Sequence, residues 1–330
     1  MNVVIVESPS KAKSINKYLG SSFKVLASVG HVRDLSPKND AIDTENNFNM
    51  KWQTSDRGKK VIKEITDAAK KSENLYLATD PDREGEAIAW HVEKLLRDNA
   101  ALSKLNIHRV TFNEITKNAV LEALKEPRKI DENLVNAYLA RRALDFLVGF
   151  NLSPVLWRKL PGSKSAGRVQ SVALKIITKR ELEIEKFNPE EYWSIKGIFS
   201  LDDSDKFEGR LIKYNNEKIE KLSIKNEKSA KEKLDFIEKS SFYVNKIEKR
   251  ETKRNPYPAF TTSSLQIEAN RKLGFSANQT MRTAQKLYEG TEIDGEPTGL
   301  ITYMRTDSVT ISEEAKSSIL SKIESKYGDS

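Results

Sequence analysis

The chain has 330 residues and a mass of 37.5 kDa, room for roughly two or three domains. The 56 Lys and Arg residues outnumber the 48 Asp and Glu residues, and the net charge of +8 favours a polyanionic partner. The absence of cysteine excludes disulfides, thiol nucleophiles and cysteine-based metal sites. No apolar run is long enough for a signal peptide or a bilayer span, and no P-loop occurs. We therefore expect a cytoplasmic protein with no membrane partner and no nucleotide cofactor.

The first 127 residues alternate short apolar runs with helical patterns. The expected strands are Val3–Val6, Phe23–Val29, Leu75–Thr79 and His108–Phe112, and the expected helices are Lys11–Leu19, Lys59–Lys71, Glu86–Arg97 and Thr116–Lys125. Strands that alternate with helices predict a mostly parallel, Rossmann-like α/β sheet.

Beyond Pro127 the pattern changes to helices and to segments of alternating apolar residues. The expected helices are Leu134–Val148, Val169–Glu185, Lys231–Lys239, Thr261–Leu273, Asn278–Tyr288 and Ser312–Lys326, and the expected strand regions are Tyr192–Tyr214, Phe242–Lys249 and Leu300–Tyr303. The chain as a whole therefore reads as a multidomain protein that combines α/β and α+β parts.

Carboxylates follow two of the buried strands. Glu7 comes directly after the first strand, and Asp80, Asp82 and Glu84 follow Leu75–Thr79. In an open parallel sheet ligands bind at the carboxyl ends of the strands, and an extended loop with this spacing turns the three side chains to one side. Converging carboxylates repel one another unless a cation lies between them, and oxygen ligands favour Mg²⁺.

The acidic loop has two other possible interpretations. Its carboxylates could simply complement the positive end of the helix that follows. A calcium loop is disfavoured, because its twelfth position, which needs an acid, is His91. Glu7 on a second buried strand, with Lys11 one helical turn beyond it, favours the magnesium hypothesis, and the helix-end role stays open.

A basic segment without any Asp or Glu extends from Phe146 to Arg180 and carries seven positive charges. It contains a loop of small residues, Ser163–Gly167, followed by Arg168 and a helical pattern. Backbone N–H groups at a helix start, together with an arginine, suit phosphates. An ordinary solvated face is the alternative, but the lack of acids favours nucleic-acid binding.

Tyr303 stands two residues before Arg305, so an extended backbone would point both side chains to one side. A phenol needs help to attack phosphorus, and an adjacent guanidinium would lower its pKa and stabilise phosphoryl charge. From local sequence alone, however, a core role remains the simpler interpretation of one tyrosine among ten.

Five motifs together are far more specific than any of them alone. They are V-V-I-V-E-S-P-S-K-A-K at Val3–Lys13, A-T-D-P-D-R-E-G-E-A-I-A-W-H at Ala78–His91, R-V-T-F-N-E-I-T at Arg109–Thr116, S-A-G-R-V-Q-S at Ser165–Ser171 and G-L-I-T-Y-M-R-T-D-S at Gly299–Ser308. In this order they resemble the type IA family of bacterial DNA topoisomerases, and the wording of the first and last fits the topoisomerase I branch better than the topoisomerase III branch.

The resemblance implies a Toprim domain over 1–127, a helical DNA-binding segment over 128–190, a β-rich arch segment over 191–250 and a helical domain over 251–330, parts of a toroid. It implies a monomer, associated with the bacterial nucleoid, that relaxes negatively supercoiled DNA without ATP. Relaxation would proceed by transient cleavage of a single strand, a 5′-phosphotyrosyl intermediate, strand passage and religation.

The resemblance also implies roles for individual residues. Tyr303 would be the nucleophile, Glu7 the general acid, and Lys11 and Arg305 would steady the phosphorus, with Arg109 also at the active site. Mg²⁺ would be held by Asp80, Asp82 and Glu84 with Glu7 nearby. The residues expected to contact or position DNA are Arg109, His31, Arg141, Arg142, Asp145, Trp157, Ser165, Ala166, Gly167, Arg168, Val169, Gln170 and Asp307.

One departure from the family pattern is the missing H-E-A-I-R-P motif, which the family carries later in its chain. We therefore expect an N-terminal fragment in which DNA cleavage or relaxation is weak or missing. Two alternative functions remain open from the sequence: another Toprim enzyme, either primase-like or nuclease-like, and a catalytically impaired module that binds single-stranded DNA.

Overall fold

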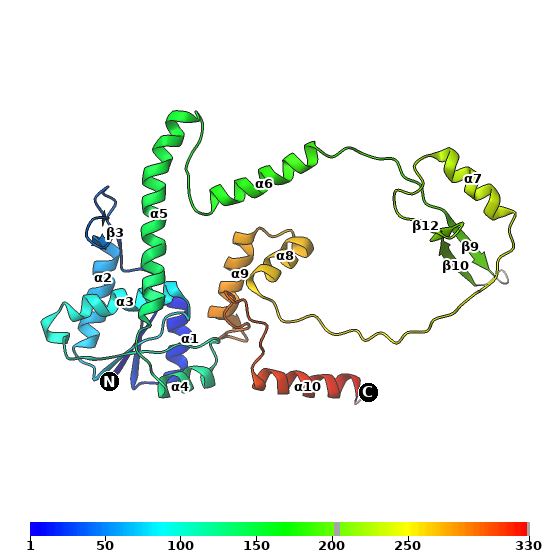
Figure 1. Ribbon diagram of the computed structural model, residues 1–330. Helices are drawn as coiled ribbons and strands as arrows, with labels where there is room; N and C mark the ends of the chain where they lie inside the picture. The colour runs from blue at the N-terminus through cyan, green and yellow to red at the C-terminus, as the bar shows by residue number, and fades with distance from the viewer. Residues whose placement is uncertain (201–204, 329–330) are drawn as a thin grey trace. The chain divides into compact units, whose positions relative to one another are not determined.

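The computed structural model describes residues 1–200 and 205–328. The chain divides into two compact units, one formed by Met1–Arg168 with Pro256–Ser330 and the other by Val169–Asn255. Figure 1 labels their elements. Among the described residues, no helix combines the length and the apolar character needed to cross a membrane.

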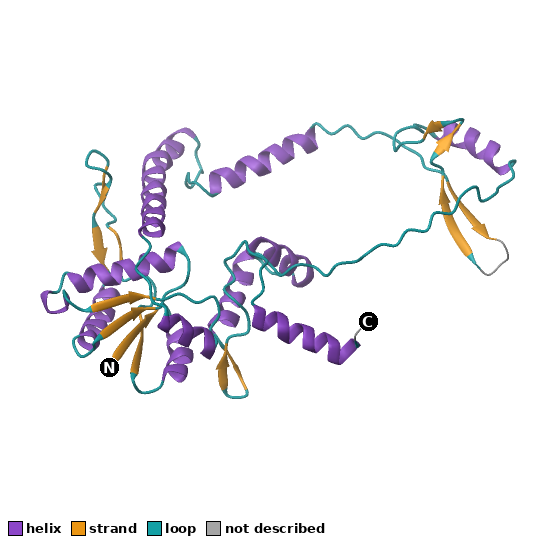
Figure 2. Ribbon diagram, turned by 60° about the horizontal axis from the view of Figure 1, so that its bottom comes forward, coloured by secondary structure: helices purple, strands orange, loops and turns teal. Residues whose placement is uncertain are grey.

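The first unit is built on a parallel sheet with the strand order β2-β1-β7-β8, visible as four neighbouring arrows in Figure 2. Its strands are β1 (Asn2–Val6), β2 (Phe23–Ala27), β7 (Asn74–Leu77) and β8 (Asn106–Arg109). The parallel α/β sheet expected from the sequence is therefore confirmed. β2 ends two residues before the expected Val29, because Val29 adopts a left-handed backbone with φ of 56° that cannot continue a strand.

Alternate residues of β1 supply two separate cores. Val3 and Ile5 pack with α2 (Asp56–Ala69) and α3 (Arg83–Arg97) on one face of the sheet. Val4 and Val6 pack on the other face with α1 (Pro9–Leu19) and α4 (Lys117–Lys125). A strand buried on both faces reads as a continuous apolar run, which is why this strand was visible in the sequence.

Smaller elements complete the amino-terminal part of this unit. They are the antiparallel pairs β3 (Arg33–Leu35) with β6 (Trp52–Thr54) and β4 (Ile42–Asp43) with β5 (Asn49–Met50), and the 3-10 helix η1 (Ala100–Leu102). These short pairs were not predicted, because two or three residues carry too little alternation to be recognised.

The long helix α5 (Glu132–Lys159) corrects the expectation of a helix that ends at Val148. It continues through Pro154, whose missing N–H leaves the carbonyl of Phe150 without its helical partner. Phe150 is 45% exposed, so water can satisfy that carbonyl. A proline at a solvated turn therefore did not stop the helix.

The carboxyl-terminal part of the same unit contains α8 (Thr262–Leu273), α9 (Ala277–Glu289), the hairpin β13 (Thr291–Ile293) with β14 (Glu296–Thr298), and α10 (Glu313–Tyr327). The expected strand Leu300–Tyr303 is wrong. Leu300 N–H donates to the carbonyl of Leu287, whereas Tyr303 N–H donates to that of Asn113. The backbone hydrogen bonds of this segment therefore reach two different parts of the chain, and a strand ladder would need successive bonds to one neighbouring strand.

The second unit contains α6 (Gln170–Glu185), β9 (Lys196–Ser200) paired antiparallel with β10 (Lys206–Arg210), the short pair β11 (Lys213–Tyr214) with β12 (Glu217–Lys218), and α7 (Glu227–Glu238). Within the expected strand region Tyr192–Tyr214, β9, β10 and β11 are confirmed, whereas residues 192–195 and 211–212 are not in strands and residues 201–204 lie outside the described residues. The expected strand Phe242–Lys249 is wrong, because the segment pairs with no strand in residues 1–200 and 205–328, and alternation alone cannot satisfy a strand's backbone.

Candidate active site

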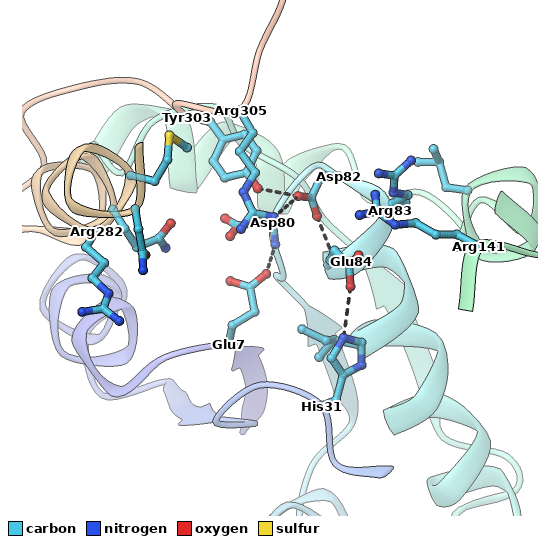
Figure 3. Close-up of a pocket in the computed structure, with 16 residues that line it drawn as sticks. Glu7, His31, Asp80, Asp82, Arg83, Glu84, Arg141, Arg282, Tyr303 and Arg305 are labelled. Carbon is cyan, nitrogen blue, oxygen red and sulfur yellow. Dashed lines mark hydrogen bonds and ion pairs between the residues drawn. The ribbon is translucent and has the colours of Figure 1, made fainter. Parts of the chain in front are cut away.

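A cavity of about 1020 Å³ lies at the carboxyl ends of β1 and β7, shown in Figure 3. Its lining includes Glu7, His31, Asp80, Asp82, Glu84, Arg141, Tyr303 and Arg305. Ligands of open parallel sheets bind at this edge. Packing of α9 and the Tyr303 segment onto the core that contains Val4 and Val6 brings the far end of the chain to this edge.

Glu7 and Asp80 share one buried lysine. Glu7 follows β1 and Asp80 follows β7, its parallel neighbour. Lys11 Nζ donates to a carboxylate oxygen of each, and Asp80 N–H donates to Glu7 Oε1. Burial raises the pKa of Glu7 to about 7, because Lys11 offsets only part of the desolvation and Asp80 adds repulsion. Glu7 can therefore carry a proton near neutral pH, as a general acid must.

Lys11 is itself completely buried. Burial lowers the pKa of its ammonium, but Glu7 and Asp80 outweigh that effect and raise the pKa above its ordinary value. Its position is set by α1, whose first turn is capped by Ser8 Oγ accepting from the Lys11 backbone N–H at 3.3 Å. The site therefore holds a fixed positive charge beside its two carboxylates.

The acidic loop is shorter than the sequence suggested, because α3 begins at Arg83. Asp82 is its N-cap, with Oδ1 accepting from Gly85 N–H at 2.8 Å. Gly85 lies so close to the loop that a Cβ there would come within 2.2 Å of the Asp80 carbonyl oxygen. Glu84 projects from the helix and lies 3.4 Å from His31 Nε2. The expectation that one extended loop aligns all three carboxylates is therefore wrong for Glu84.

The carboxylates fit a hard divalent cation by their chemistry, since four of them line one cavity. In the arrangement described, no three His, Asp or Glu side chains among the described residues are gathered closely enough to surround an ion. Asp82 bonds to Tyr303 and Arg305, and Glu84 contacts His31. The helix-capping role, left open by the sequence, is realised by Asp82 alongside its place in this acidic set.

Tyr303 points into the acidic set, although the residue is only 7% exposed. Its Oη donates to Asp82 Oδ2 at 2.7 Å, and Arg305 Nη1 lies 3.2 Å from the same oxygen. Both side chains therefore face one side of the segment. Arg305 lowers the pKa of Tyr303 as expected, but burial raises it, Asp80 and Asp82 add to the rise, and together they outweigh the effect of Arg305.

Arg109 is buried beneath the acidic loop and does not line the cavity. Its Nε donates to Glu86 Oε2 at 2.9 Å, and Glu86 also accepts from Arg128 and from the Asp131 backbone. Its Nη atoms donate to the carbonyls of Leu77, Thr79, Asp80 and Val110. The expectation of a residue that acts on DNA is corrected here: Arg109 clamps the backbone from which Asp80 projects.

Four of the expected DNA-binding residues meet in a second cavity of about 280 Å³: His31, Arg141, Arg142 and Asp145. The His31 ring stacks on Tyr138 with centroids 5.3 Å apart. Arg142 Nη2 pairs with Asp34 Oδ1 at 2.7 Å. His31, Glu84 and Arg141 line both cavities, so the two are adjacent.

The other expected DNA-binding residues lie outside both cavities. Trp157 is 56% exposed and donates from Nε1 to the Lys164 carbonyl at 2.7 Å. Ala166, in the Ser165–Arg168 loop, donates its N–H to Ser153 Oγ of α5 at 3.2 Å. Asp307 is exposed. Val169 and Gln170 belong to the second unit, at the start of α6.

Arg168 qualifies the basic character of its segment. Its Nε lies 2.8 Å from Oδ1 of Asp145. Asp145 is the residue directly before the segment without Asp or Glu. The pair is partly exposed, with side chains 35% and 39% accessible, so it adds little to stability and a phosphate could compete for Arg168. The sequence interpretation of an uncompensated basic run therefore needs this correction.

We expect Arg168→Ala to weaken binding of a single-stranded oligonucleotide and to reduce the salt slope by about one. Asp145→Asn should strengthen binding, because it releases Arg168 from its ion pair. Fluorescence anisotropy at several salt concentrations measures both, with the exposed Arg57→Ala on α2 as the control. An unchanged slope in Arg168→Ala would identify the loop as an ordinary solvated surface.

The contribution of α9 to the lining of the cavity was not predicted from the sequence. Asn278, Arg282 and Gln285 all line the larger cavity, at helical spacings of four and three residues. Tyr288, one turn beyond Gln285, is completely buried between Lys11 and Tyr303. Polar residues repeating on one face of a helix were the available signal. Nothing local indicated that this face meets the acidic strands.

Comparison with known proteins agrees with this architecture. A family model for the Toprim domain matches residues 2–115, and one described as DNA topoisomerase matches residues 129–330. DNA topoisomerase 1 of Rickettsia felis is 56% identical over 330 residues, all of this chain and 42% of that protein. DNA topoisomerase 1 of Zymomonas mobilis is 53% identical over 327 residues, 99% of this chain and 26% of that protein.

A solved structure is also similar. Full-length topoisomerase I from Thermotoga maritima matches with a TM-score of 0.81 and 40% identity, over 99% of this chain and 53% of that one. The fold and the site thus define a Toprim protein in which a tyrosine faces the acidic strand ends. The chain belongs to the DNA topoisomerase family, in its bacterial type IA class. It spans about two fifths of the length of its Rickettsia relatives.

Proposed function

We propose that this chain carries the strand-cleaving centre of a topoisomerase that relaxes negatively supercoiled DNA without ATP. The observation that carries the proposal is the contact of Tyr303 Oη with Asp82 Oδ2 at 2.7 Å, beside Arg305 and in one cavity with Glu7. A nucleophile, a proton donor and cations face one space there. That combination suits transfer of a phosphoryl group between two oxygens.

In the proposed reaction, Tyr303 Oη attacks a phosphorus of single-stranded DNA. A bond forms from Oη to phosphorus while the bond from phosphorus to the 3′-oxygen breaks. The phenolic proton leaves toward Asp82, which already accepts its hydrogen bond. Glu7, whose pKa burial raises to about 7, gives a proton to the 3′-oxygen. Religation reverses these steps, so the phosphotyrosyl bond retains the energy of the cut and no nucleotide is consumed.

Lys11 and Arg305 are the cations that would oppose charge on the phosphoryl oxygens. Arg305 is half exposed at the cavity, whereas Lys11 is buried behind Glu7 and Asp80. By analogy with oxyanion-hole donors, each such contact can contribute about 2.7–4 kcal/mol to the transition state. Arg305 therefore suits direct contact with the phosphate, and Lys11 keeps the acidic pair compensated.

Toprim domains of topoisomerases are generally metal-dependent. We take Mg²⁺ as the ion, because hard carboxylate oxygens are its preferred protein ligands and it coordinates phosphates readily. Asp80, Asp82 and Glu84 would hold it, with Glu7 nearby. When bound, the ion supplies positive charge that offsets the carboxylates and the DNA phosphate.

The proposed partner is DNA that is locally single-stranded, and the protein would act as a monomer at the bacterial nucleoid. The net charge of +8 supports a polyanionic partner. The two adjacent cavities offer the cations of Arg141 and Arg142 and the His31 ring beside the proposed cleavage centre, groups that suit phosphates and unstacked bases.

The polarity of the covalent adduct tests the proposal. A single-stranded oligonucleotide is labelled at either end, incubated with the protein and Mg²⁺, and analysed on a denaturing gel. The 3′-labelled strand should migrate with the protein, and the 5′-labelled strand should appear as a shortened free product. Absence of any adduct, or an adduct on the 5′-labelled strand, would contradict a 5′-phosphotyrosyl intermediate.

The same gel separates the two alternative functions. A nuclease-like Toprim enzyme would shorten the strand without a protein adduct, and a binding module would leave it intact while still retarding it under native conditions. The match of residues 129–330 to the DNA topoisomerase family includes Tyr303, and nothing in the comparisons favours either alternative.

The metal assignment has its own test in the double variant Asp80→Asn with Asp82→Asn. We expect it to lower the affinity for Mg²⁺ at least tenfold in calorimetry and to remove the Mg²⁺ dependence of cleavage, because two anionic oxygen ligands are lost. Affinity for a single-stranded oligonucleotide should remain. Asp67→Asn, on the exposed side of α2, is the matched control. A double variant that binds Mg²⁺ normally would place the site elsewhere.

A further inference from the structure

Tyr288 is a second tyrosine at the centre of the site, and neither the sequence patterns nor the proposed reaction gives it a role. It lies in the last turn of α9 and is completely buried. Its Oη lies 3.5 Å from the carbonyl oxygen of Phe112. It does not line the cavity, so it is not placed to act as a nucleophile.

Its ring contacts two residues of the proposed reaction at once. The rings of Tyr288 and Tyr303 meet edge to face, with centroids 5.3 Å apart and planes at 63°. That geometry is a favourable one for aromatic pairs. On its other side, Lys11 Nζ lies 5.1 Å from the centroid of the Tyr288 ring. A cation at this distance is attracted by the negative face of the ring.

These contacts complete the surroundings of the Lys11 ammonium. Glu7 and Asp80 accept two of its hydrogen bonds, and the Tyr288 ring adds a negative surface without adding a charge. Because Lys11 is completely buried, no water competes for that contact. The same ring packs against the ring of Tyr303, whose hydroxyl donates to Asp82.

We propose that Tyr288 is a positioning residue whose ring packs against both the Lys11 ammonium and the Tyr303 ring and thereby sets these two groups relative to each other. The inference rests on the proposed strand cleavage and deepens it. The ring carries the effect, because it is the part of Tyr288 that meets both Lys11 and Tyr303. The hydroxyl faces Asp80 as well as the Phe112 carbonyl, so Tyr288→Phe tests whether it contributes.

Three variants of the protein separate ring from hydroxyl. Tyr288→Phe keeps the ring, and Tyr288→Met keeps an apolar side chain of similar reach without a π face. Leu96→Ala makes a cavity at a buried position of the other core and controls for lost stability. The readouts are the single-turnover rate of adduct formation at saturating 3′-labelled oligonucleotide and the Kd for that oligonucleotide.

We expect Tyr288→Met to slow adduct formation at least tenfold with Kd unchanged within twofold. Tyr288→Phe and Leu96→Ala should stay within threefold of the parent rate. A parent-like rate in Tyr288→Met would overturn the inference. Equal slowing in Tyr288→Phe would also overturn it, because the hydroxyl would then be responsible, as would a loss confined to Kd.

A series of ring-fluorinated phenylalanines at position 288 tests the same point if Tyr288→Met fails to fold. Fluorine withdraws the negative charge of the ring face while nearly keeping its shape. The cleavage rate should fall stepwise with each fluorine, and a flat series would overturn the inference. If the parent protein itself forms no adduct, the proposed function fails. If the parent forms it and these variants match the parent, only the role of Tyr288 fails.

Discussion

Replacing Tyr303 with phenylalanine should abolish the covalent protein–DNA adduct, by at least about a thousandfold, as expected for loss of a nucleophile. The variant loses only the Oη atom and its 2.7 Å hydrogen bond to Asp82. The ring stays packed against Tyr288, so the fold should survive with a change of no more than about 1.5 kcal/mol. Denaturing gels with 3′-labelled oligonucleotide measure the adduct.

The control for this experiment is Tyr18→Phe. Tyr18 lies on α1 in the same unit, and its hydroxyl contacts only the Ile115 carbonyl among the hydrogen bonds of the described residues. That variant should form adduct at the parent rate. Single-strand affinity should be equal in all three proteins, because no phosphate-binding cation is altered. Persistent adduct in Tyr303→Phe would assign the nucleophile to another residue and remove the basis of the proposed function.

The second large effect concerns stability. Glu86→Ala should lower the free energy of unfolding of the first unit by about 3–5 kcal/mol. Glu86 is completely buried, and its two carboxylate oxygens accept from Arg109, Arg128 and the Asp131 backbone. Its removal leaves the buried guanidinium of Arg109 without a counter-charge. Urea unfolding followed by the fluorescence of Trp52 and Trp90 measures the change.

The matched control is Glu93→Ala, which removes a partly exposed ion pair with Arg97 on the same helix. It should cost no more than about 1 kcal/mol. Acid provides a further check. Burial raises the pKa of Glu86, but Arg128 and Arg109 outweigh it and hold the pKa below its ordinary value. Its stabilisation is therefore present at neutral pH and lost as the pH falls through the lowered pKa.

The difference in the free energy of unfolding between the parent and Glu86→Ala should therefore become smaller in acid. Equal stabilities at neutral pH would mean that Arg109 is compensated by other groups, and the clamp beneath the acidic loop would lose its importance. Loss of the clamp should also loosen the carbonyls of Thr79 and Asp80, which Arg109 holds.

The parallel sheet and the carboxylates at its strand ends could be predicted from the sequence, because their signals are local. Val3–Val6 is apolar at every position, which marks a strand buried on both faces, and Glu7 follows it directly. Leu75–Thr79 likewise predicted β7, which ends at Leu77, and Asp80 lies three residues beyond that end. Ser8 and Asp82 are short polar residues at helix starts, where they cap α1 and α3.

Other expectations failed where a partner far away in sequence decides the outcome. Phe242–Lys249 alternates like a strand, yet a strand needs a neighbour to accept its hydrogen bonds, and none pairs with it in the described part of the chain. The helix expected to end at Val148 continues through Pro154 to Lys159, because the turn at this proline is solvated. Arg109 looked available for DNA, but the carbonyls at the end of β7 and the carboxylate of Glu86 engage it completely.

The sequence by itself determined that short buried strands alternate with helices, that carboxylates follow two of these strands, and that the protein carries excess positive charge, because backbone propensity and composition act over a few residues. Only the tertiary structure decided that Tyr303 meets Asp82 across 221 positions and that Tyr288 lies between it and Lys11. It also decided the protonation tendencies, since burial raises the pKa values of both Glu7 and Tyr303. Desolvation and charge pairing depend on which groups are packed together, and local sequence does not carry that information.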